Sequence, residues 1–332
     1  MKAKIDIISG FLGAGKTTLI KKLLEEKLSH EKLVIIENEF GEVGIDGSIL
    51  KNSGIEVKEI NSGCICCTLV GDFGKAIEEV LIKHTPDRVI IEPSGVGKLS
   101  DIIKACNAPQ LKELLTINML IAVVDVLKYQ IYLSNFGEFF ENQITHAKTV
   151  VLSRTQRIDN AGLESVVNSI RSLNAKAHII TTPWETLPAE RILSVAEQDI
   201  SVSLEHQLRD DTKIAKMLPM HQKNCDCGCN HEHSHNHSAD AFFDVWGVET
   251  PKMFEQEELS SKLHDLGNEK VLGRILRGKG ILQTDNNTWV QFDYVPGECD
   301  VKPSAADYTG RLCIIGKDLN TIELCRLFGI SA

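Results

Sequence analysis

The clearest chemical pattern lies near the start of the chain, where residues 10–17 have the sequence GFLGAGKT and fit G-x-x-x-x-G-K-[ST]. Glycines in such a loop let backbone N–H groups surround phosphate oxygens, and a helix beginning at Lys16 adds its positive end. Lys16 would reach the β- and γ-phosphates, and Thr17 would ligate Mg²⁺. A turn that merely joins strand to helix is the alternative, which the complete pattern disfavours. The expected nucleotide contacts here are Gly10, Gly13, Ala14, Gly15, Lys16, Thr17 and Thr18.

A second candidate element follows a buried strand, where Glu92 precedes Pro93, Ser94 and Gly95. An acid at a strand end beside a phosphate loop can support the Mg²⁺ shell, and the Gly95 N–H can donate to the γ-phosphate. An ordinary Glu at the end of a strand is the alternative. Asp46 lies between two glycines and is a candidate for a mobile catalytic loop, although an exposed turn Asp has the same sequence signature. Lys16, Glu92 and Asp46 are therefore the candidate catalytic residues.

Three cysteines, Cys64, Cys66 and Cys67, lie on a predicted strand-to-helix connection. Thiolates, with a carboxylate from Glu37 or Glu42 nearby, are ligands that Zn²⁺, Co²⁺ or Ni²⁺ accept. A helix start also lowers the pKa of a thiol, which favours the thiolate. Inert buried cysteines and a redox switch remain as alternatives.

A second group of candidate ligands lies in a polar stretch in which alternate residues are cysteine or histidine. Alternate spacing in a flexible segment lets several side chains reach one ion, and seven ligands exceed what one tetrahedral site needs. An expression tag is the plain alternative, which the internal position and the cysteines disfavour. The candidate ligands are Cys225, Cys227, Cys229, His231, His233, His235 and His237.

Short apolar runs alternate with helical periodicity over residues 1–200, which predicts a doubly wound, mostly parallel α/β sheet of the P-loop NTPase type. The expected strands are Ile5–Ile8, Leu33–Ile36, Glu56–Ile60, Arg88–Ile91, Met119–Val124, Thr149–Leu152 and His178–Thr181. The expected helices begin at Lys16 and cover Leu69–Lys83, Phe136–His146 and Leu163–Leu173.

Apolar periodicity fades over residues 201–239, which we expect to form a flexible Cys/His-rich linker. Residues 240–332 predict a small α+β domain of the split-βαβ type. Its expected strands are Ala241–Val248, Lys270–Leu276, Thr288–Tyr294 and Arg311–Gly316, and its expected helices are Gln256–Leu266 and Leu319–Phe328.

Composition narrows the class of partner. The chain has 332 residues, 42% of them hydrophobic, and a formal net charge of -10. That charge argues against a nucleic acid or an anionic membrane surface as partner, because both need a basic face. The first strand starts close to Met1 and no apolar run is long enough for a membrane span, so we expect a cytoplasmic protein. Ten cysteines in a reducing compartment indicate metal or redox sites rather than disulfides.

Taken together, these motifs resemble the CobW-like family of metal-trafficking P-loop GTPases, which includes the UreG and HypB types. The similar segments are Ser9–Thr18, Glu37–Asp46, Gly63–Cys67, Glu92–Gly95, Leu276–Leu282 and Trp289. The resemblance implies a GTPase with GTP and Mg²⁺ at the phosphate loop, whose hydrolysis drives delivery of a transition metal to a client metalloprotein. Nucleotide-dependent self-association is an open option.

The chain departs from the family where Asn-Lys-x-Asp is expected after a strand, because Ser153, Arg154, Thr155 and Gln156 stand there instead. The aspartate of that motif accepts from two donors on guanine, so neutral Gln156 loses charge-assisted bonds worth about 1.5–3 kcal/mol. Arg154 can still stack on the base. Ser153, Arg154 and Gln156 are the candidate base contacts, and guanine selectivity is an open question.

The sequence therefore predicts a GTP hydrolase that acts as a metallochaperone for zinc, cobalt or nickel. One alternative is a metal-storage or sensing protein in which the nucleotide is only a switch. Another is an activator that inserts metal or a corrin cofactor into one enzyme. Metal-dependent nucleotide hydrolysis would separate the first alternative from the metallochaperone.

Overall fold

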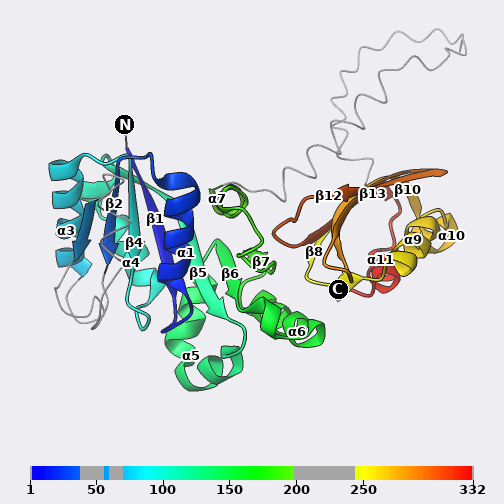
Figure 1. Cartoon of the computed structure of the whole chain (residues 1–332), viewed down its shortest axis with the longest axis horizontal. Helices are drawn as coiled ribbons and strands as arrows, with labels where there is room; N and C mark the ends of the chain where they lie inside the picture. The colour runs from blue at the N-terminus through cyan, green and yellow to red at the C-terminus, as the bar shows by residue number, and fades with distance from the viewer. Residues whose placement is uncertain (1, 38–55, 60–69, 198–243, 331–332) are drawn as a thin grey trace, which may run out of the picture. The chain divides into compact units, whose positions relative to one another are not determined.

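The computed structural model describes residues 2–37, 56–59, 70–197 and 244–330. The chain divides into two compact units (Figure 1). The first consists of Met1–Gln198 with Asp307–Thr309, and the second of Asp199–Ala306 with Gly310–Ala332. Within the described ranges, no helix combines the length and the apolar character that crossing a bilayer requires.

The first unit is built on a seven-stranded sheet in the order β3-β2-β4-β1-β5-β6-β7. Every pair of neighbouring strands runs parallel, so the carboxyl ends of all the strands meet at one edge. The strand bounds are Ala3–Gly10 (β1), Leu33–Glu37 (β2), Glu56–Glu59 (β3), Arg88–Glu92 (β4), Leu115–Asp125 (β5), Thr149–Ser153 (β6) and His178–Ile180 (β7). The predicted parallel α/β sheet is confirmed.

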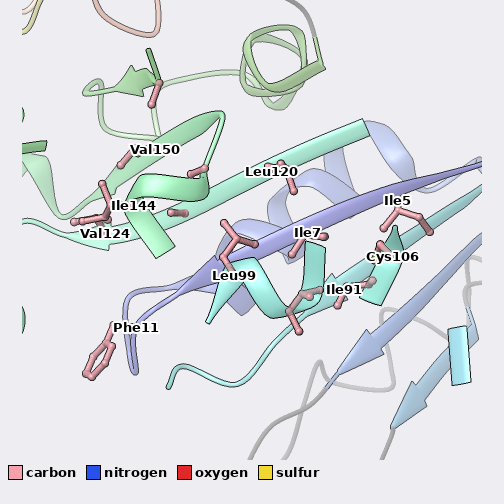
Figure 2. Close-up of a cluster of buried hydrophobic side chains, with 14 of the residues drawn as sticks. Ile5, Ile7, Phe11, Ile91, Leu99, Cys106, Leu120, Val124, Ile144 and Val150 are labelled. Carbon is pink, nitrogen blue, oxygen red and sulfur yellow. The ribbon is translucent and has the colours of Figure 1, made fainter. Parts of the chain in front are cut away.

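Helices cover both faces of this sheet, because its strands are apolar on both sides. Helix α1 contacts α7, whereas α3, α4, α5 and α6 contact one another in series. Figure 2 shows the core under the second group, where Ile5, Ile7 and Ile91 of the strands meet Leu99 of α4 and Ile144 of α5. The helix bounds are Lys16–Leu23 (α1), Val70–His84 (α3), Leu99–Cys106 (α4), Tyr129–His146 (α5), Asn160–Leu173 (α6) and Ala189–Glu197 (α7).

The second unit contains a six-stranded sheet in the order β12-β11-β10-β13-β8, with β9 beside β10. Strands β8 and β10 are both antiparallel to β13, so they run parallel with one strand between them. Helix α9 connects them, and the predicted split-βαβ arrangement is confirmed. The bounds are Asp244–Thr250 (β8), Met253–Phe254 (β9), Gln256–Asp265 (α9), Glu269–Leu272 (α10), Arg274–Thr284 (β10), Trp289–Val295 (β11), Glu298–Ser304 (β12), Gly310–Lys317 (β13) and Thr321–Phe328 (α11).

The predicted strand Lys270–Leu276 is wrong over its first half, where α10 stands and Gly273 separates it from β10. The apolar run was misleading because Val271 is exposed while Leu272 packs in the core. Strand β12 was not predicted, since its residues are nearly all exposed and show no alternation of apolar and polar types.

Candidate nucleotide site

The phosphate loop joins β1 to α1 in the form that its sequence predicts. Gly13 and Gly15 have φ angles of 67° and 105°, a region that favours glycine. Gly15 is also approached closely, because a Cβ there would lie 2.9 Å from the ring of Trp184. Lys16 begins α1 and is buried, while Thr18 is exposed on the same helix. The loop therefore ends at a helix N-terminus, where backbone N–H groups and the helix dipole favour an anion.

Thr17 and Glu92 come together across 75 residues of sequence. The Thr17 hydroxyl donates to Oε1 of Glu92 at 2.9 Å, and Glu92 is the last residue of β4, the strand beside β1. Glu92 is buried. Hydroxyl and carboxylate oxygens are the hard ligands that Mg²⁺ prefers, so this pair fits a magnesium ion at the first turn of α1.

The loop after β4 lies directly against the phosphate loop. A Cβ at Gly95 would lie 2.7 Å from the backbone nitrogen of Leu12, a separation that real Cβ atoms do not show. Gln143 of α5, fully buried, holds this loop from behind, because its Nε2 donates to the carbonyls of Gly95 (3.1 Å) and Gly97 (2.9 Å). No sequence signal pointed to Gln143.

Helix α5 also holds the phosphate loop itself. The Tyr132 hydroxyl donates to the Leu12 carbonyl at 3.3 Å, and the rings of Phe11 and Tyr132 lie 4.5 Å apart between centroids. The ring of Phe140 meets Phe11 edge-on at 6.0 Å. One helix therefore contacts both loops that are candidates for binding phosphate.

The turn after β6 is tied to the same loop through Arg154. Its backbone is left-handed, with φ of 60°, and its guanidinium donates to Asp125 and, at 3.1 Å, to the Gly13 carbonyl. Asp125 ends β5, is buried, and also accepts from the backbone N–H of Leu127 at 3.0 Å. Sequence reasoning missed Asp125, although an acid at the end of a buried strand is the signal that identified Glu92.

The other two candidate base contacts lie on the same turn. Ser153 is buried, and its hydroxyl donates to the Val124 carbonyl at 3.4 Å. Gln156 is exposed, and its Nε2 donates to Oε1 of Glu185 at 3.4 Å. Glu185 follows β7 and was not predicted as a site residue.

Of the candidate metal ligands, Glu37 is placed by the structure. It is the buried last residue of β2 and the register partner of Glu92 on β4 and of Glu59 on β3. The cysteine motif falls in the connection between β3 and α3. The candidate residues outside the described ranges are Glu42, Asp46, Cys64, Cys66, Cys67, Cys225, Cys227, Cys229, His231, His233, His235 and His237.

The described ranges hold no group of three or more His, Cys, Asp and Glu side chains that could bind a metal ion. Their four cysteines, Cys106, Cys299, Cys313 and Cys325, form no disulfide. Burial raises the pKa of the Cys106 thiol to about 12, which keeps it protonated and inert. Cys106, Cys313 and Cys325 are buried, whereas Cys299 is exposed. The candidate metal ligands among the cysteines remain those in the two sequence clusters.

Comparison with known proteins decides the family. Residues 4–181 match the CobW/HypB/UreG nucleotide-binding domain, and residues 243–329 match the C-terminal domain of the cobalamin synthesis protein cobW. The chain belongs to the CobW/HypB/UreG family. The resemblance found from the motifs is thereby confirmed.

Several relatives of this CobW/HypB/UreG protein have names that describe a role. It is 34% identical over 203 residues to the zinc chaperone CobW of Sinorhizobium sp, with 53% of this chain and 57% of that protein covered. It is 30% identical to the zinc chaperone YeiR of Escherichia coli, covering 66% and 69%. It is 27% identical over 356 residues to the zinc-regulated GTPase metalloprotein activator 1 of Schizosaccharomyces pombe, covering 96% and 83%. The match thus spans little more than half of the first relative's length.

Proposed function

We propose that this protein is a Mg²⁺-dependent GTP hydrolase that works as a metallochaperone, carrying Zn²⁺ to a client metalloprotein. The observation that carries the hydrolase part is the contact of 2.9 Å between Thr17 and Glu92 beside a complete phosphate loop. Family membership and the names of the relatives support the metallochaperone part.

Each residue of the loop has a role that follows from its position. The backbone N–H groups of residues 13–17 and the Lys16 ammonium bind and orient the phosphate chain. Thr17, with Glu92 behind it, would hold Mg²⁺, which would supply positive charge beside the β- and γ-phosphate oxygens. Gly95 donates its N–H to the γ-phosphate, because it already lies against Leu12 of the loop. Loss of that phosphate releases the loop after β4.

The cargo site adjoins the nucleotide site on the same edge of the sheet. Glu37 and Glu92 are register partners on adjacent strands, which stand about 4.8 Å apart in a sheet. Cys64, Cys66 and Cys67 follow the carboxyl end of the next strand, β3. We infer that Glu37 and two or three of these thiolates hold the metal, with Glu42 as a further oxygen ligand, and that release of the γ-phosphate loosens them.

Zinc is the proposed cargo because Cys and Glu ligands suit it and because three relatives carry zinc in their names. Cobalt and nickel accept similar ligands and are therefore competitors in the test. Thiolate ligands also need a reducing environment, which supports action in the cytoplasm.

The test is GTP hydrolysis by the full chain in Mg²⁺, without added metal and with Zn²⁺, Co²⁺ or Ni²⁺ at controlled free concentrations. We expect hydrolysis that depends on free Zn²⁺, and loss of that dependence in Cys66→Ser/Cys67→Ser, since a neutral hydroxyl is a poor ligand for Zn²⁺. The matched control is Cys313→Ser/Cys325→Ser, which changes two buried cysteines of the other unit. If the rate of hydrolysis were the same without added metal and with each of the three metals, the GTPase proposal would stand and the metallochaperone proposal would be overturned.

A further inference from the structure

Guanine presents two hydrogen-bond donors, N1–H and the exocyclic amine, so a site that selects it needs an acceptor, and the two loops that contact the phosphate loop are the candidates to supply one. The first flanking loop, residues 153–159, follows β6, and the second, residues 181–188, follows β7. They contain two carboxylates, Asp159 and Glu185. Asp159 is committed to capping α6, where its Oδ1 accepts from the Gly162 N–H at 2.8 Å. Glu185 is therefore the carboxylate of the two loops that is left to contribute to the base site, either directly or through a neighbouring side chain.

Both flanking loops are fixed against the phosphate loop. Arg154 ties the first loop to the Gly13 carbonyl at 3.1 Å, and the buried ring of Trp184 packs the second against Gly15. Glu185 follows Trp184 directly. Its carboxylate accepts from Nε2 of Gln156, whose side chain is exposed like that of Glu185. The pair therefore joins the two loops at the end of the turn where a guanine-recognising aspartate would stand.

This contact determines which way the Gln156 amide faces. A glutamine amide carries one acceptor oxygen and one donor nitrogen, and it turns over unless a partner fixes it. Since the Glu185 carboxylate can only accept, the nitrogen of Gln156 faces Glu185, and Oε1 is left pointing away from that carboxylate. We propose that Glu185 is a positioning residue for base selection: it holds the Gln156 amide so that Oε1 accepts from guanine. This inference rests on the proposed nucleotide hydrolase function.

The proposal predicts a specific change in base preference. With the amide fixed, Gln156 offers an acceptor alone, which suits guanine. With the amide free, its nitrogen can also donate to the 2-oxo group of xanthine or to N1 of adenine, while its oxygen accepts from N1–H of xanthine or the amine of adenine. Removal of Glu185 should therefore favour xanthine and adenine at the expense of guanine.

The experiment measures dissociation constants of GDP, XDP and ADP, each with Mg²⁺, for the full chain and its variants. Diphosphates avoid turnover during the measurement. In Glu185→Ala we expect the preference for GDP over XDP to fall about ten-fold, the value of one hydrogen bond. The control is Glu190→Ala, which removes an exposed carboxylate that pairs with Lys27 at 3.1 Å. It should leave the ratio unchanged, since loss of a distant negative charge affects all three diphosphates alike.

A second variant distinguishes positioning from simple charge. Gln156→Asp alone brings two carboxylates together, whereas Gln156→Asp/Glu185→Gln leaves one carboxylate at the position of the base. The double variant should restore the preference for GDP that Glu185→Ala loses. A GDP:XDP ratio in Glu185→Ala within two-fold of the parent would overturn the inference while leaving the hydrolase proposal intact. A parent protein that binds none of the three diphosphates would overturn both.

Discussion

Each strand of the parallel sheet begins in one half of the sheet, here called the amino-terminal half, and finishes in the other, the carboxyl-terminal half. The two halves hold their polar side chains in different ways. In the amino-terminal half, Arg88 is buried and donates to Asp6 (2.5 Å), Glu31 (2.6 Å) and Glu197 (2.8 Å). Asn118 of β5 donates to the same Asp6 and Glu197. These bonds run from side chain to side chain, and they join β1, β4, β5 and α7 with the turn before β2.

In the carboxyl-terminal half, four further bonds run from side chains to the backbone of loops, beside the side-chain contacts of Thr17 with Glu92 and of Arg154 with Asp125. Gln143 donates to the carbonyls of Gly95 and Gly97, Arg154 to that of Gly13, and Tyr132 to that of Leu12. Two of these bonds hold the loop after β4, and two hold the phosphate loop. The difference indicates that the amino-terminal half supplies stability and the carboxyl-terminal half supplies function.

The largest effect should come from Arg88→Met, which leaves the Asp6 carboxylate buried without its cation. Breaking a buried ion pair on one side costs about 3–5 kcal/mol, so the free energy of unfolding should fall by that amount in urea denaturation. The control is Lys104→Met, which breaks an exposed pair with Asp101 and should cost at most about 0.5 kcal/mol. A similar small loss in both variants would remove the claimed difference between the two halves.

Unlike Arg88→Met, Lys16→Ala should leave the free energy of unfolding unchanged and weaken nucleotide binding. It deletes the cation that we propose faces the β- and γ-phosphates, so GTP affinity should fall about a hundred-fold, as expected for loss of charge-assisted hydrogen bonds. Lys21→Ala on the same helix is the control. Equal GTP affinity in the parent and in Lys16→Ala, measured by calorimetry, would refute the phosphate-loop assignment.

A smaller, pH-dependent effect is expected at Glu197. Burial raises the pKa of its carboxyl, but hydrogen bonds from Arg88 and Asn118 outweigh burial and lower it below the ordinary 4.5. A lowered pKa contributes stability above the unfolded value, and that stability disappears as pH falls through the folded value. Glu197→Gln should therefore cost about 1–2 kcal/mol at pH 7 and progressively less below pH 4.5. A pH-independent cost would show that packing, not charge, holds this residue.

The smallest effect on hydrolysis should follow deletion of residues 225–237, which carry the alternate cysteines and histidines. The polar composition predicts a flexible linker here, and such a segment would have to become ordered to bind, so we expect its metal affinity to be lower than that of the closely spaced cysteine motif. We expect fewer bound metal ions and slower loading, with hydrolysis changed by less than about two-fold, since no group facing the phosphates is removed. Deletion of residues 207–219, of equal length and without Cys or His, is the control. If the deletion also removed the tightest metal site, residues 225–237 and not the cysteine motif would contain that site, which would contradict this prediction.

The sequence predicted the features that depend on local patterns, and it missed the residues whose roles depend on contacts with distant parts of the chain. The phosphate loop, the strand ending at Glu92 and the parallel sheet were predicted because glycine spacing and apolar runs are local signals. Gln143 and Glu185 were not, because their roles come from partners at 95–97 in one case and at 156 in the other. A single buried glutamine in a helix and a single exposed glutamate in a loop have no distinguishing pattern.

Helices α4 and α7 were also not predicted from the sequence. Each is short, with eight and nine residues, and each is stabilised by packing on the sheet or a neighbouring helix rather than by length. The turn at residues 153–156 was predicted in part. Its departure from Asn-Lys-x-Asp is visible in the sequence, but the partner of Gln156 is visible only in the structure. The sequence therefore identified the position at which guanine selectivity is in question, and the structure identified Glu185 as a residue that contacts this position.

The central claim is that the nucleotide state at Lys16, Thr17 and Glu92 controls the metal held by Glu37 and the cysteine motif. The direct measurement is Zn²⁺ affinity, by competition with a chromophoric chelator, of protein lacking residues 225–237 and saturated with Mg²⁺ and either GDP or a non-hydrolysable GTP analogue. Allosteric coupling between sites is typically 5–150-fold, and we expect Zn²⁺ to bind about ten-fold more tightly with the analogue. Equal Zn²⁺ affinity in the two nucleotide states, with both nucleotides shown to be bound, would contradict the account.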